Sequence, residues 1–492
     1  MEWGFVGGAY QAANPMQDNQ VCINWFVELA GTDDAKVPAA LLGCPGLVAI
    51  GTGTSGEGRG AWTLPGGTAC LLVVGWSVVL MTIQTAATAT SMPTFAYRTI
   101  GYLSTGAGPV KIRDNGTGGI AVIVDGTSLY VYNIAAKTLV KSTDPAWLPS
   151  ATVAMIDGWF IFQATGTQKF FTSPLYWNGT SALDATYYAL KDDSSDNLVA
   201  IIENNRQLWL IGESTTEPWY NAGGNYFPFS RLQGALTQVG CAAAQTVCRT
   251  GQGLMWLARS ERGENSVIMT QGYSFASVTT PAVAYALNQY PVVNDALAYV
   301  YAEEGHEFYV LTLPTADMTW VYDLTTKQWH QRASFDPSTG LFHRQRVSAL
   351  ANFSGMRVGI DYQNGRIYWI TRTSYADDQY PLVAVRRAPH VWDGGDRSRV
   401  IQSHLRIDFF PGAGISTGQG KNPQAMLKVS NDGGLTWGPE RWASMGAIGK
   451  TLARAIWRKL GQARDRVYEV RVSDPVRRDI AGATIKSDPT AA

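Results

Sequence analysis

The segment from Gly305 to His330 constrains the fold most strongly, because it holds three strand signals and the turns between them. An apolar and aromatic run ends at Pro314, a second run ends at Asp323, and a polar turn leads to Trp329. Short strands joined by tight turns, with aromatic residues repeated along the sheet, are typical of β-propeller blades. The segment therefore predicts an all-β fold built from four-stranded sheets.

The same pairing of apolar runs recurs along the chain. Asp125-Gly126, Asp157-Gly158 and Asn364-Gly365 each separate two such runs, and these dipeptides tolerate the positive φ of a tight hairpin turn. The hairpins recur at intervals of roughly 40–50 residues, as expected for propeller blades. Residues 61–385 therefore leave room for about six blades, with seven as the alternative.

Composition divides the chain into four parts. Residues 1–60 are rich in Gly, Pro, Ala and Asn and hold few long strand signals, which predicts an extended N-terminal arm. Residues 61–385 form the predicted β-propeller. Residues 386–487 are more polar and basic, and their alternating runs predict a separate C-terminal β-rich module. Residues 488–492 are predicted to form a loose tail.

The bulk composition suits an all-β chain without a global charge preference. The 492 residues include 51 glycines, 22 tyrosines and 17 tryptophans, which favour turns and sheet faces. Lys plus Arg and Asp plus Glu both number 39, so no net charge draws the chain to nucleic acid or a membrane. Five cysteines without a C-x-x-C pair argue against a disulfide framework and a zinc site. With no secretory signal and no apolar run of about 20 residues, we expect a soluble protein made in a cytoplasm.

Residues 430–437 match the Asp box, Ser-x-Asp-x-Gly-x-Thr-Trp, of sialidases and other β-propellers. Ser and Asp side chains hydrogen-bond turn amides, Gly takes the positive φ, and Trp packs on the sheet. The positions concerned are Ser430, Asp432, Gly434 and Trp437. The motif predicts a β-hairpin and is weak evidence for glycosidase chemistry, because it is a folding device and occurs once here.

No motif predicts an enzyme. The glycine-rich segment 51–58 has Glu57 where a phosphate-binding loop needs lysine, and the five histidines show no metal-ligand spacing. Adjacent acids are usually solvated surface charge, and we interpret three such pairs in that way: Asp192-Asp193, Glu303-Glu304 and Asp377-Asp378. We predict no catalytic residue, no cofactor and no metal.

The C-terminal part carries many arginines, which suggests either a phosphate-facing or partner-facing surface or ordinary exposed ion pairs. Arg466 and Arg471 have acidic neighbours at Asp465, Glu469 and Asp474. Exposed cross-strand pairs are the favoured interpretation for most of these arginines, and a few are expected to line an interface.

Several short segments, taken in order, resemble the packaged-DNA-stabilisation proteins of short-tailed bacteriophages, the tail hub or nozzle family. The resemblance extends from Gly4 to about Ile485, and no single motif is long. In the middle of the chain, the resemblance implies a structural role for six signature positions: Thr216, Glu217, Trp219, His306, Trp320 and Trp329. The other segments that carry the resemblance are Gly8-Ala9-Tyr10, Cys22–Glu28, Pro45-Gly46-Leu47, Arg59-Gly60, Phe227–Arg231 and Pro389–Asp393.

This resemblance implies a virion protein of the phage tail, present as a ring that is hexameric in relatives. Its implied partners are further copies of the chain, the portal and adaptor proteins above it, and a tail needle, spike or fibre. Double-stranded DNA would pass through the ring without sequence specificity, and no small-molecule substrate is implied. The ring would retain packaged DNA and conduct it during ejection.

Two alternatives remain open. The Asp box and the many aromatic residues favour a glycan-binding or sialidase-like propeller, although alternating aromatics more often pack within sheets. The second alternative is a propeller scaffold that binds a protein in its central funnel, because propellers host many functions. Self-assembly into a closed ring separates the tail-hub hypothesis from both.

Overall fold

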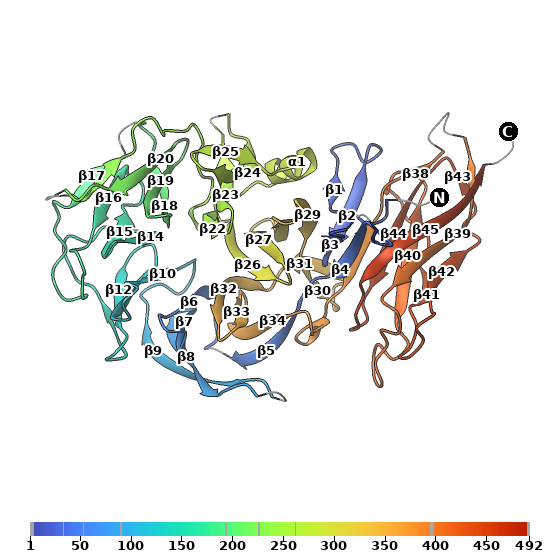
Figure 1. Ribbon diagram of the computed structural model, residues 1–492, viewed down its shortest axis with the longest axis horizontal. Helices are drawn as coiled ribbons and strands as arrows, with labels where there is room; N and C mark the ends of the chain where they lie inside the picture. Colours follow the sequence, from blue (N-terminus) through green and yellow to red (C-terminus); the bar gives the residue numbers. More distant parts are fainter. Residues whose placement is uncertain are drawn as a thin grey trace.

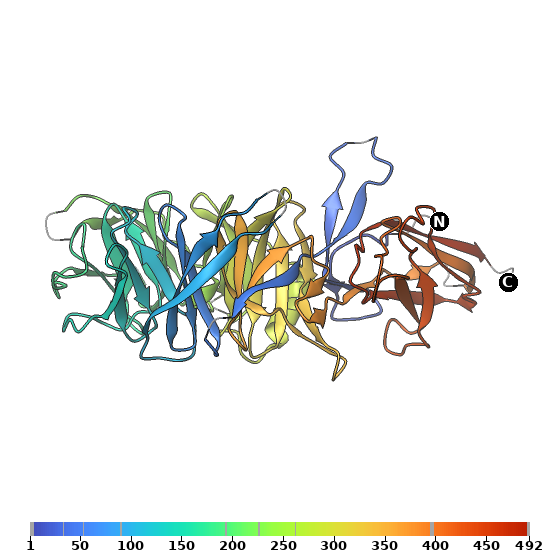
Figure 2. The same ribbon diagram turned by 90° about the horizontal axis from the view of Figure 1, so that it is seen from below.

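The computed structural model describes residues 4–32, 34–52, 54–88, 91–191, 194–224, 227–260, 262–393 and 398–489. These residues form two neighbouring bodies, a ring of β-sheets and a β-sandwich at its rim (Figure 1). Seen from the side, the ring is a disc with the sandwich beside it (Figure 2). The predicted all-β fold, a propeller followed by a C-terminal β module, is confirmed.

The ring consists of seven antiparallel four-stranded units, one for each blade. The first three blades comprise β6 (Gly58–Thr63), β7 (Ala69–Val74), β8 (Ser77–Thr85) and β9 (Thr94–Tyr102); β10 (Lys111–Asp114), β11 (Ile120–Val124), β12 (Leu129–Asn133) and β13 (Thr138–Lys141); and β14 (Val153–Ile156), β15 (Trp159–Gln163), β16 (Lys169–Thr172) and β17 (Tyr188–Leu190). The next two comprise β18 (Leu198–Asn204), β19 (Gln207–Gly212), β20 (Thr216–Asn221) and β21 (Phe229–Arg231), then β22 (Cys248–Thr250), β23 (Gly253–Arg259), β24 (Asn265–Gln271) and β25 (Ser274–Ser277).

The sixth and seventh blades lie next to the sandwich. The sixth comprises β26 (Leu297–Glu303), β27 (His306–Leu313), β28 (Met318–Asp323) and β29 (Gln328–Gln331). The seventh comprises β32 (Val347–Phe353), β33 (Met356–Asp361), β34 (Arg366–Thr371) and β5 (Gly46–Thr52), extended by β35 (Ala376–Asp377) and β36 (Tyr380–Pro381). Between them lies the hairpin of β30 (Ala333–Asp336) and β31 (Leu341–Arg344), and blades 4 to 6 are linked through η1 (Ala244–Thr246) and α1 (Pro281–Gln289).

The ring is closed by a strand from the N-terminal region. β5 pairs antiparallel with β34, with Leu47 opposite Ile370, and the chain then enters β6 of the first blade. The first and last blades are thereby joined by one continuous segment. The sequence predicts about six blades in residues 61–385, with seven as the alternative. Because β5 lies before Ala61 and completes a blade, the structure has seven blades.

Each blade packs on its neighbours through its own cluster of buried apolar side chains. One such cluster joins the first and second blades around Leu71 and Ile123, and another closes the ring between the seventh and first blades around Leu72 and Ile360. Similar clusters occupy the other blade interfaces. Burial of apolar surface between successive blades therefore stabilises the whole ring.

The C-terminal module is a sandwich of two sheets that both take strands from the N-terminal region. One sheet contains β37 (Ala384–Arg387), β44 (Asp465–Val472), β40 (Gln424–Ser430) and β41 (Arg441–Ser444), with β38 (Val391–Trp392) beside β44. The other contains β3 (Trp25–Leu29), β4 (Ala39–Gly43), β45 (Ile480–Pro489), β39 (Val400–Phe409) and β42 (Ala455–Arg458), with β43 (Gln462–Ala463) beside β39.

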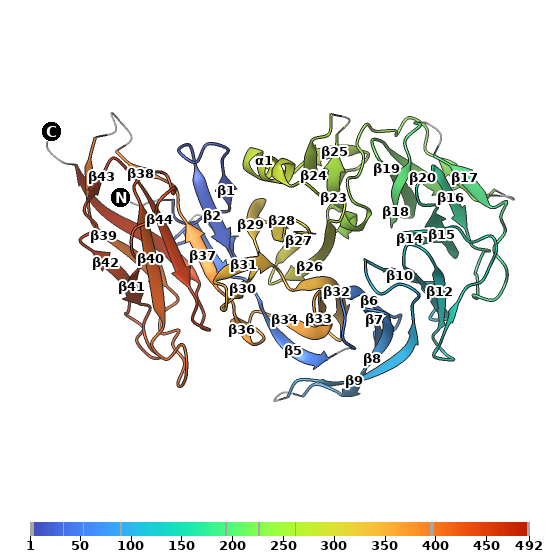
Figure 3. The same ribbon diagram turned by 180° about the vertical axis from the view of Figure 1, so that it is seen from behind.

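A single strand near the N-terminus connects the two bodies. β2 (Asn19–Ile23), which pairs with the short β1 (Tyr10–Gln11), runs parallel to β29 of the sixth blade and antiparallel to β37 of the sandwich. The result is one 11-stranded sheet that continues from blade to sandwich. Seen from behind, β2 lies between the two bodies (Figure 3).

The first 60 residues therefore differ from the extended arm predicted for them. Their strands are short and pair with partners hundreds of residues away, so local sequence patterns do not reveal them. The β3–β4 hairpin projects from one face of the molecule (Figure 2). At the other end, β45 continues to Pro489 and includes the start of the predicted tail, whose last three residues lie outside the described residues.

In the part of the chain that the structure describes, no helix has the length and apolar character needed to cross a membrane.

Candidate functional site

The first group of signature positions lies on β20 in the fourth blade. The Thr216 hydroxyl donates to the Val239 carbonyl oxygen (2.6 Å), and the Trp219 indole N–H donates to Glu217 (3.2 Å). Main-chain bonds between Thr216 and Thr237 extend the same edge. All three signature side chains are buried, so they fix the local shape of the blade and offer no exposed surface for a ligand.

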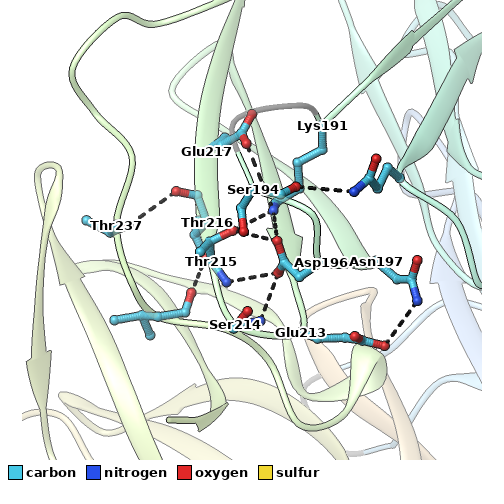
Figure 4. A network of polar contacts seen from close by, with 12 residues as sticks. Lys191, Ser194, Asp196, Asn197, Glu213, Ser214, Thr215, Thr216, Glu217 and Thr237 are labelled. Atoms are coloured by element: carbon cyan, nitrogen blue, oxygen red, sulfur yellow. Dashed lines mark hydrogen bonds and ion pairs between the residues drawn. The ribbon is translucent and has the colours of Figure 1, made fainter. Parts of the chain in front are cut away.

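Beside Glu217 lies a buried lysine, Lys191, which sequence reasoning missed (Figure 4). Its ammonium group contacts the Asp196 carboxylate and the Thr215 hydroxyl, and it lies 3.9 Å from Glu217. Asp196 also accepts hydrogen bonds from the backbone N–H groups of Ser214 (2.9 Å) and Thr215 (3.0 Å). Burial alone would raise the pKa of Asp196, but these hydrogen bonds hold that pKa well below its ordinary value. The network links the third and fourth blades as a buried ionic cluster.

The second group of signature positions lies in the sixth blade, so the structure places the two groups on different sheets. His306, at the start of β27, binds Asp323 through Nδ1 (2.7 Å) and Glu28 through Nε2 (3.0 Å). Glu28 belongs to β3, so the histidine ties the N-terminal hairpin to the blade. The hydrogen bond to Asp323 raises the pKa of His306 to about 8, with burial opposing and Glu28 adding to the shift. The imidazolium is therefore a buried ionic link between two segments.

The two signature tryptophans pack in the core beside this link. Trp320 and Trp329 are buried with ring centroids 6.4 Å apart, close to perpendicular. Trp320 donates its indole N–H to the Tyr290 hydroxyl (3.2 Å), and Trp329 donates to the Val278 carbonyl (2.8 Å). Large aromatic side chains with satisfied N–H groups stabilise a core without providing a binding surface.

The Asp box lies at the end of β40 in the sandwich. The Ser430 hydroxyl donates to Asp432 (2.6 Å) and accepts from the Gly434 N–H (2.8 Å), and Gly434 takes a positive φ of 94°. Asp432 also accepts from the backbone N–H of Thr436 (2.9 Å), and bonds to Ser430 and Thr436 lower its pKa to about 2. The Trp437 ring lies 4.9 Å from the Arg387 guanidinium. The polar side chains of Ser430 and Asp432 therefore bind other groups of the same turn.

A buried arginine anchors the N-terminal segment at the junction between propeller and sandwich. Arg386, on β37, donates to the carbonyl oxygens of Phe5 (2.7 Å), Gly8 (2.9 Å) and Val21 (3.3 Å) and to Gln20 Oε1 (2.6 Å). Its side chain is fully buried, and burial lowers its pKa to about 10. One guanidinium therefore satisfies four acceptors from the first 21 residues.

Further buried charges lie where the N-terminal segment, seventh blade and sandwich meet. Arg332 donates to the Pro45 carbonyl (2.6 Å), and Arg478 donates to those of Leu382 (3.2 Å) and Cys44 (3.3 Å). Asp377 is buried near both arginines. Burial raises the pKa of Asp377 to about 6, and the positive charges of Arg332, Arg346 and Arg478 oppose that shift. The junction is therefore held by buried polar contacts as well as by apolar packing.

These contacts correct two predictions about charge. Glu303 and Asp377 were expected to be surface charges, yet both are buried, and Glu303 pairs with Arg357 at 2.6 Å. Asp192 and Asp193 lie outside the described residues. Arg466 was expected in an exposed pair, but it is buried and donates to Asn431 (2.9 Å) and the Leu460 carbonyl (2.7 Å). The error has one cause, because partners distant in sequence bury charges that local patterns place at the surface.

Among the described residues, no group of three or more His, Cys, Asp or Glu side chains is arranged to hold a metal ion. Residues 384–387 read Ala-Val-Arg-Arg without alternation of apolar and polar residues, so the local sequence does not single out Arg386 as buried.

A seven-bladed propeller joined by a shared sheet to a β-sandwich defines this chain as a two-domain β protein. Residues 23–375 match the β-propeller of Bacteriophage P22 Gp10, and residues 387–488 match its β-sandwich. The chain belongs to this family of phage stabilisation proteins and is a structural protein of a bacteriophage virion.

Comparison with other known proteins adds little to this assignment. No curated protein matches the sequence. The N-terminal domain of Nup159 is 9% identical, covers 71% of this chain and 98% of its own, and has a TM-score of 0.39. The β-propeller domain of Myceliophteria thermophila Cps50 (Swd1) is 8% identical, covers 66% of this chain and 99% of its own, and also has a TM-score of 0.39.

Proposed function

We propose that this chain forms the tail hub, or nozzle, of a short-tailed bacteriophage. In this role, copies of the chain form a ring, hexameric as in relatives, below the portal and adaptor. The ring retains packaged DNA and forms the channel for its ejection. The observation that carries the proposal is family membership over both domains, residues 23–375 and 387–488.

The charge of the chain supports a channel that does not grip DNA. Each phosphate that a protein neutralises adds to its affinity, so a strongly basic wall would hold the genome in place. Here Lys plus Arg and Asp plus Glu both number 39, which gives no net charge. A near-neutral ring allows double-stranded DNA to pass without sequence specificity.

The construction of the molecule supports a role under pressure. The propeller is closed by β5, and β2 continues the sixth blade into the sandwich. Force on either domain is therefore carried by main-chain hydrogen bonds of one sheet, rather than by a linker.

The remaining proposed partners are a tail needle and a spike or fibre, and no small-molecule substrate is proposed.

A DNA-retention assay tests the proposal. Phage particles made without this chain should package DNA and then release it, so that nuclease degrades most of the genome. Adding the purified chain should restore nuclease protection, whereas an unrelated propeller of similar size should not. Particles that keep their DNA without the chain would contradict retention, and a ring too narrow for duplex DNA in every state would contradict conduction but not plugging.

The glycan-binding or sialidase-like alternative gains no support from the Asp box. The Ser430 hydroxyl and Asp432 carboxylate bind groups of their own turn, and the motif lies in the sandwich. A sialoside assay and a glycan array with the purified chain test this alternative, and we expect neither turnover nor binding.

A further inference from the structure

The propeller encloses a cavity of about 660 Å³ at its centre. Every blade contributes its inner strand to the lining, from β6 of the first blade to β32 of the seventh. Volumes of roughly 300–1,000 Å³ are typical of sites for small molecules. The cavity belongs to one chain and is distinct from any channel formed by a ring of chains.

Four basic residues line this cavity, and one of them, Arg59 on β6, donates its guanidinium N–H groups to carbonyl oxygens of its own blade and of the loop that follows it. The other three come from two blades. Lys111 and Arg113 are two residues apart on β10, so they share one face of the strand, while Ile112 between them is buried in the apolar core. Arg249 contributes from β22. The positive charge is therefore supplied by rigid strands and not by loops.

Three acids line the cavity, and the first of them, Glu57, accepts from the Gly108 N–H (3.3 Å). Glu203 pairs with Arg249 at 3.0 Å. Asp114 accepts from the Trp62 indole N–H (2.6 Å) and from the Gly116 N–H (2.7 Å). Among the described residues, neither Lys111 nor Arg113 forms an ion pair with a carboxylate. Two cations are thus left facing the cavity without a partner acid.

The surroundings of Lys111 and Arg113 favour a bound anion over hydration of the two cations by water. The Arg113 guanidinium lies 4.4 Å from the centre of the Trp62 ring, which covers one of its faces. Its Nη1 donates to the Ile112 carbonyl oxygen (3.0 Å), so the N–H groups on its other edge are the ones proposed to meet an acceptor. Burial lowers the pKa of both Lys111 and Arg113 below their ordinary values. A bound anion offsets the cost of keeping two poorly hydrated cations close together.

We propose that the central cavity binds a phosphate-class oxyanion between Lys111, Arg113 and Arg249. The planar guanidinium donates two parallel N–H groups to phosphate oxygens, and the lysine supplies a point charge. A phosphate ion fills only part of about 660 Å³, so a phosphate monoester with a larger organic group also fits. The inference does not depend on the tail-hub role.

Isothermal titration calorimetry of the full chain with inorganic phosphate and with phenyl phosphate tests the proposal. We expect one site per chain, and affinity at least about tenfold weaker in Lys111→Met and in Arg113→Met. Glu203→Gln removes the nearby negative charge and should strengthen binding. Lys450→Met, an exposed lysine in the sandwich, is the matched control and should bind as the parent does.

The two probes distinguish the source of the oxyanion. Binding of both at similar affinity identifies a site for the free ion, and preferential binding of phenyl phosphate identifies a monoester site. Absence of saturable binding of either probe at millimolar concentration would overturn the proposal. Equally weakened probe affinity in Lys450→Met would also overturn the proposal. So would unchanged affinity in Lys111→Met and Arg113→Met when both variants keep the native circular dichroism spectrum.

Discussion

The propeller blades and the propeller–sandwich junction are built on opposite principles. Within a blade, successive strands pair across short turns, as β7 and β8 do with Val74 opposite Ser77. At the junction, Val21 pairs with Arg387, and Arg386 donates to the Phe5 carbonyl, so each contact joins opposite ends of the chain. The first six blades are therefore specified locally, whereas the seventh blade, which takes β5, and the junction exist only when the whole chain has folded.

The two regions also differ in what holds them together. Neighbouring blades pack mainly through apolar clusters, and a buried ionic cluster around Lys191 is added between the third and fourth blades. The junction relies on buried arginines, each of which satisfies several acceptors: Arg332, Arg386 and Arg478. Loss of one such arginine leaves several polar groups buried without partners, which is costly. The junction is therefore the more sensitive region to single substitutions.

The largest effect is expected from Arg386→Met. The change removes the hydrogen bonds that Arg386 donates to the Phe5, Gly8 and Val21 carbonyl oxygens, and we expect about 3–5 kcal/mol loss in the free energy of unfolding. Chemical denaturation measures this loss, and limited proteolysis should release the N-terminal segment first. Arg206→Met, at an exposed ion pair with Asp157, is the matched control and should cost less than about 1 kcal/mol. Equal costs for the two variants would contradict the contrast between junction and blade.

The next effect is expected inside the propeller, at Lys191→Met. This change leaves the Asp196 carboxylate without the ammonium group that it contacts, and we expect a loss of about 3 kcal/mol in the free energy of unfolding. Hydrogen exchange should show opening in the third and fourth blades while β2 keeps its protection. Lys169→Met, which removes a lysine over the Tyr188 ring, should cost less than about 1 kcal/mol. Faster hydrogen exchange in β2 of the Lys191→Met variant would mean that the blades and the junction open together.

A smaller, pH-dependent effect is expected at His306. Its pKa is raised to about 8 in the folded protein, so its stabilisation is complete below its unfolded value of about 6.5 and disappears as the pH rises through 8. The shift corresponds to about 2 kcal/mol. The stability advantage of the parent over His306→Gln should shrink by that amount between about pH 6 and pH 9. A difference that stays constant with pH would show that the imidazolium does not link Glu28 to Asp323.

The smallest effect is expected from Asp432→Asn in the Asp box. Asp432 is half-buried and its carboxylate bonds groups of its own turn, so the melting temperature should hardly change. Faster amide exchange at Leu435 and Thr436 is the expected local consequence. Asp336→Asn, in the β30–β31 hairpin, is the control and should leave both amides unchanged. A large loss of global stability would show that the sandwich depends on this turn.

The same contrast explains how much the sequence predicts. The hairpins at Asp125-Gly126, Asp157-Gly158 and Asn364-Gly365 are confirmed, because a turn and its two strands are neighbours in sequence. The hydrogen bonds of the Asp box also join neighbours in sequence, because Ser430 bonds Asp432 and Gly434 within one turn. The positions of β5 and β2 could not be predicted, because their partners lie more than 300 residues away.

The buried charges escaped prediction for the same physical reason. Lys191, Arg386 and Asp377 look like surface residues in their local sequence, and only the assembled fold removes them from water. The resemblance to the phage family identified aromatic signature positions such as Trp320 and Trp329, and both side chains lie in the core. It did not identify the charged side chains that tie the segments together.

Native mass spectrometry of the purified chain, alone and mixed with portal and adaptor rings, tests the tail-hub proposal most directly. We predict a closed ring with six times the mass of the 53.4 kDa chain, formed alone or on the adaptor, and a stable complex with the adaptor ring. A chain that stays monomeric and ignores both partner rings would contradict the tail-hub role, although the fold and the family assignment would stand.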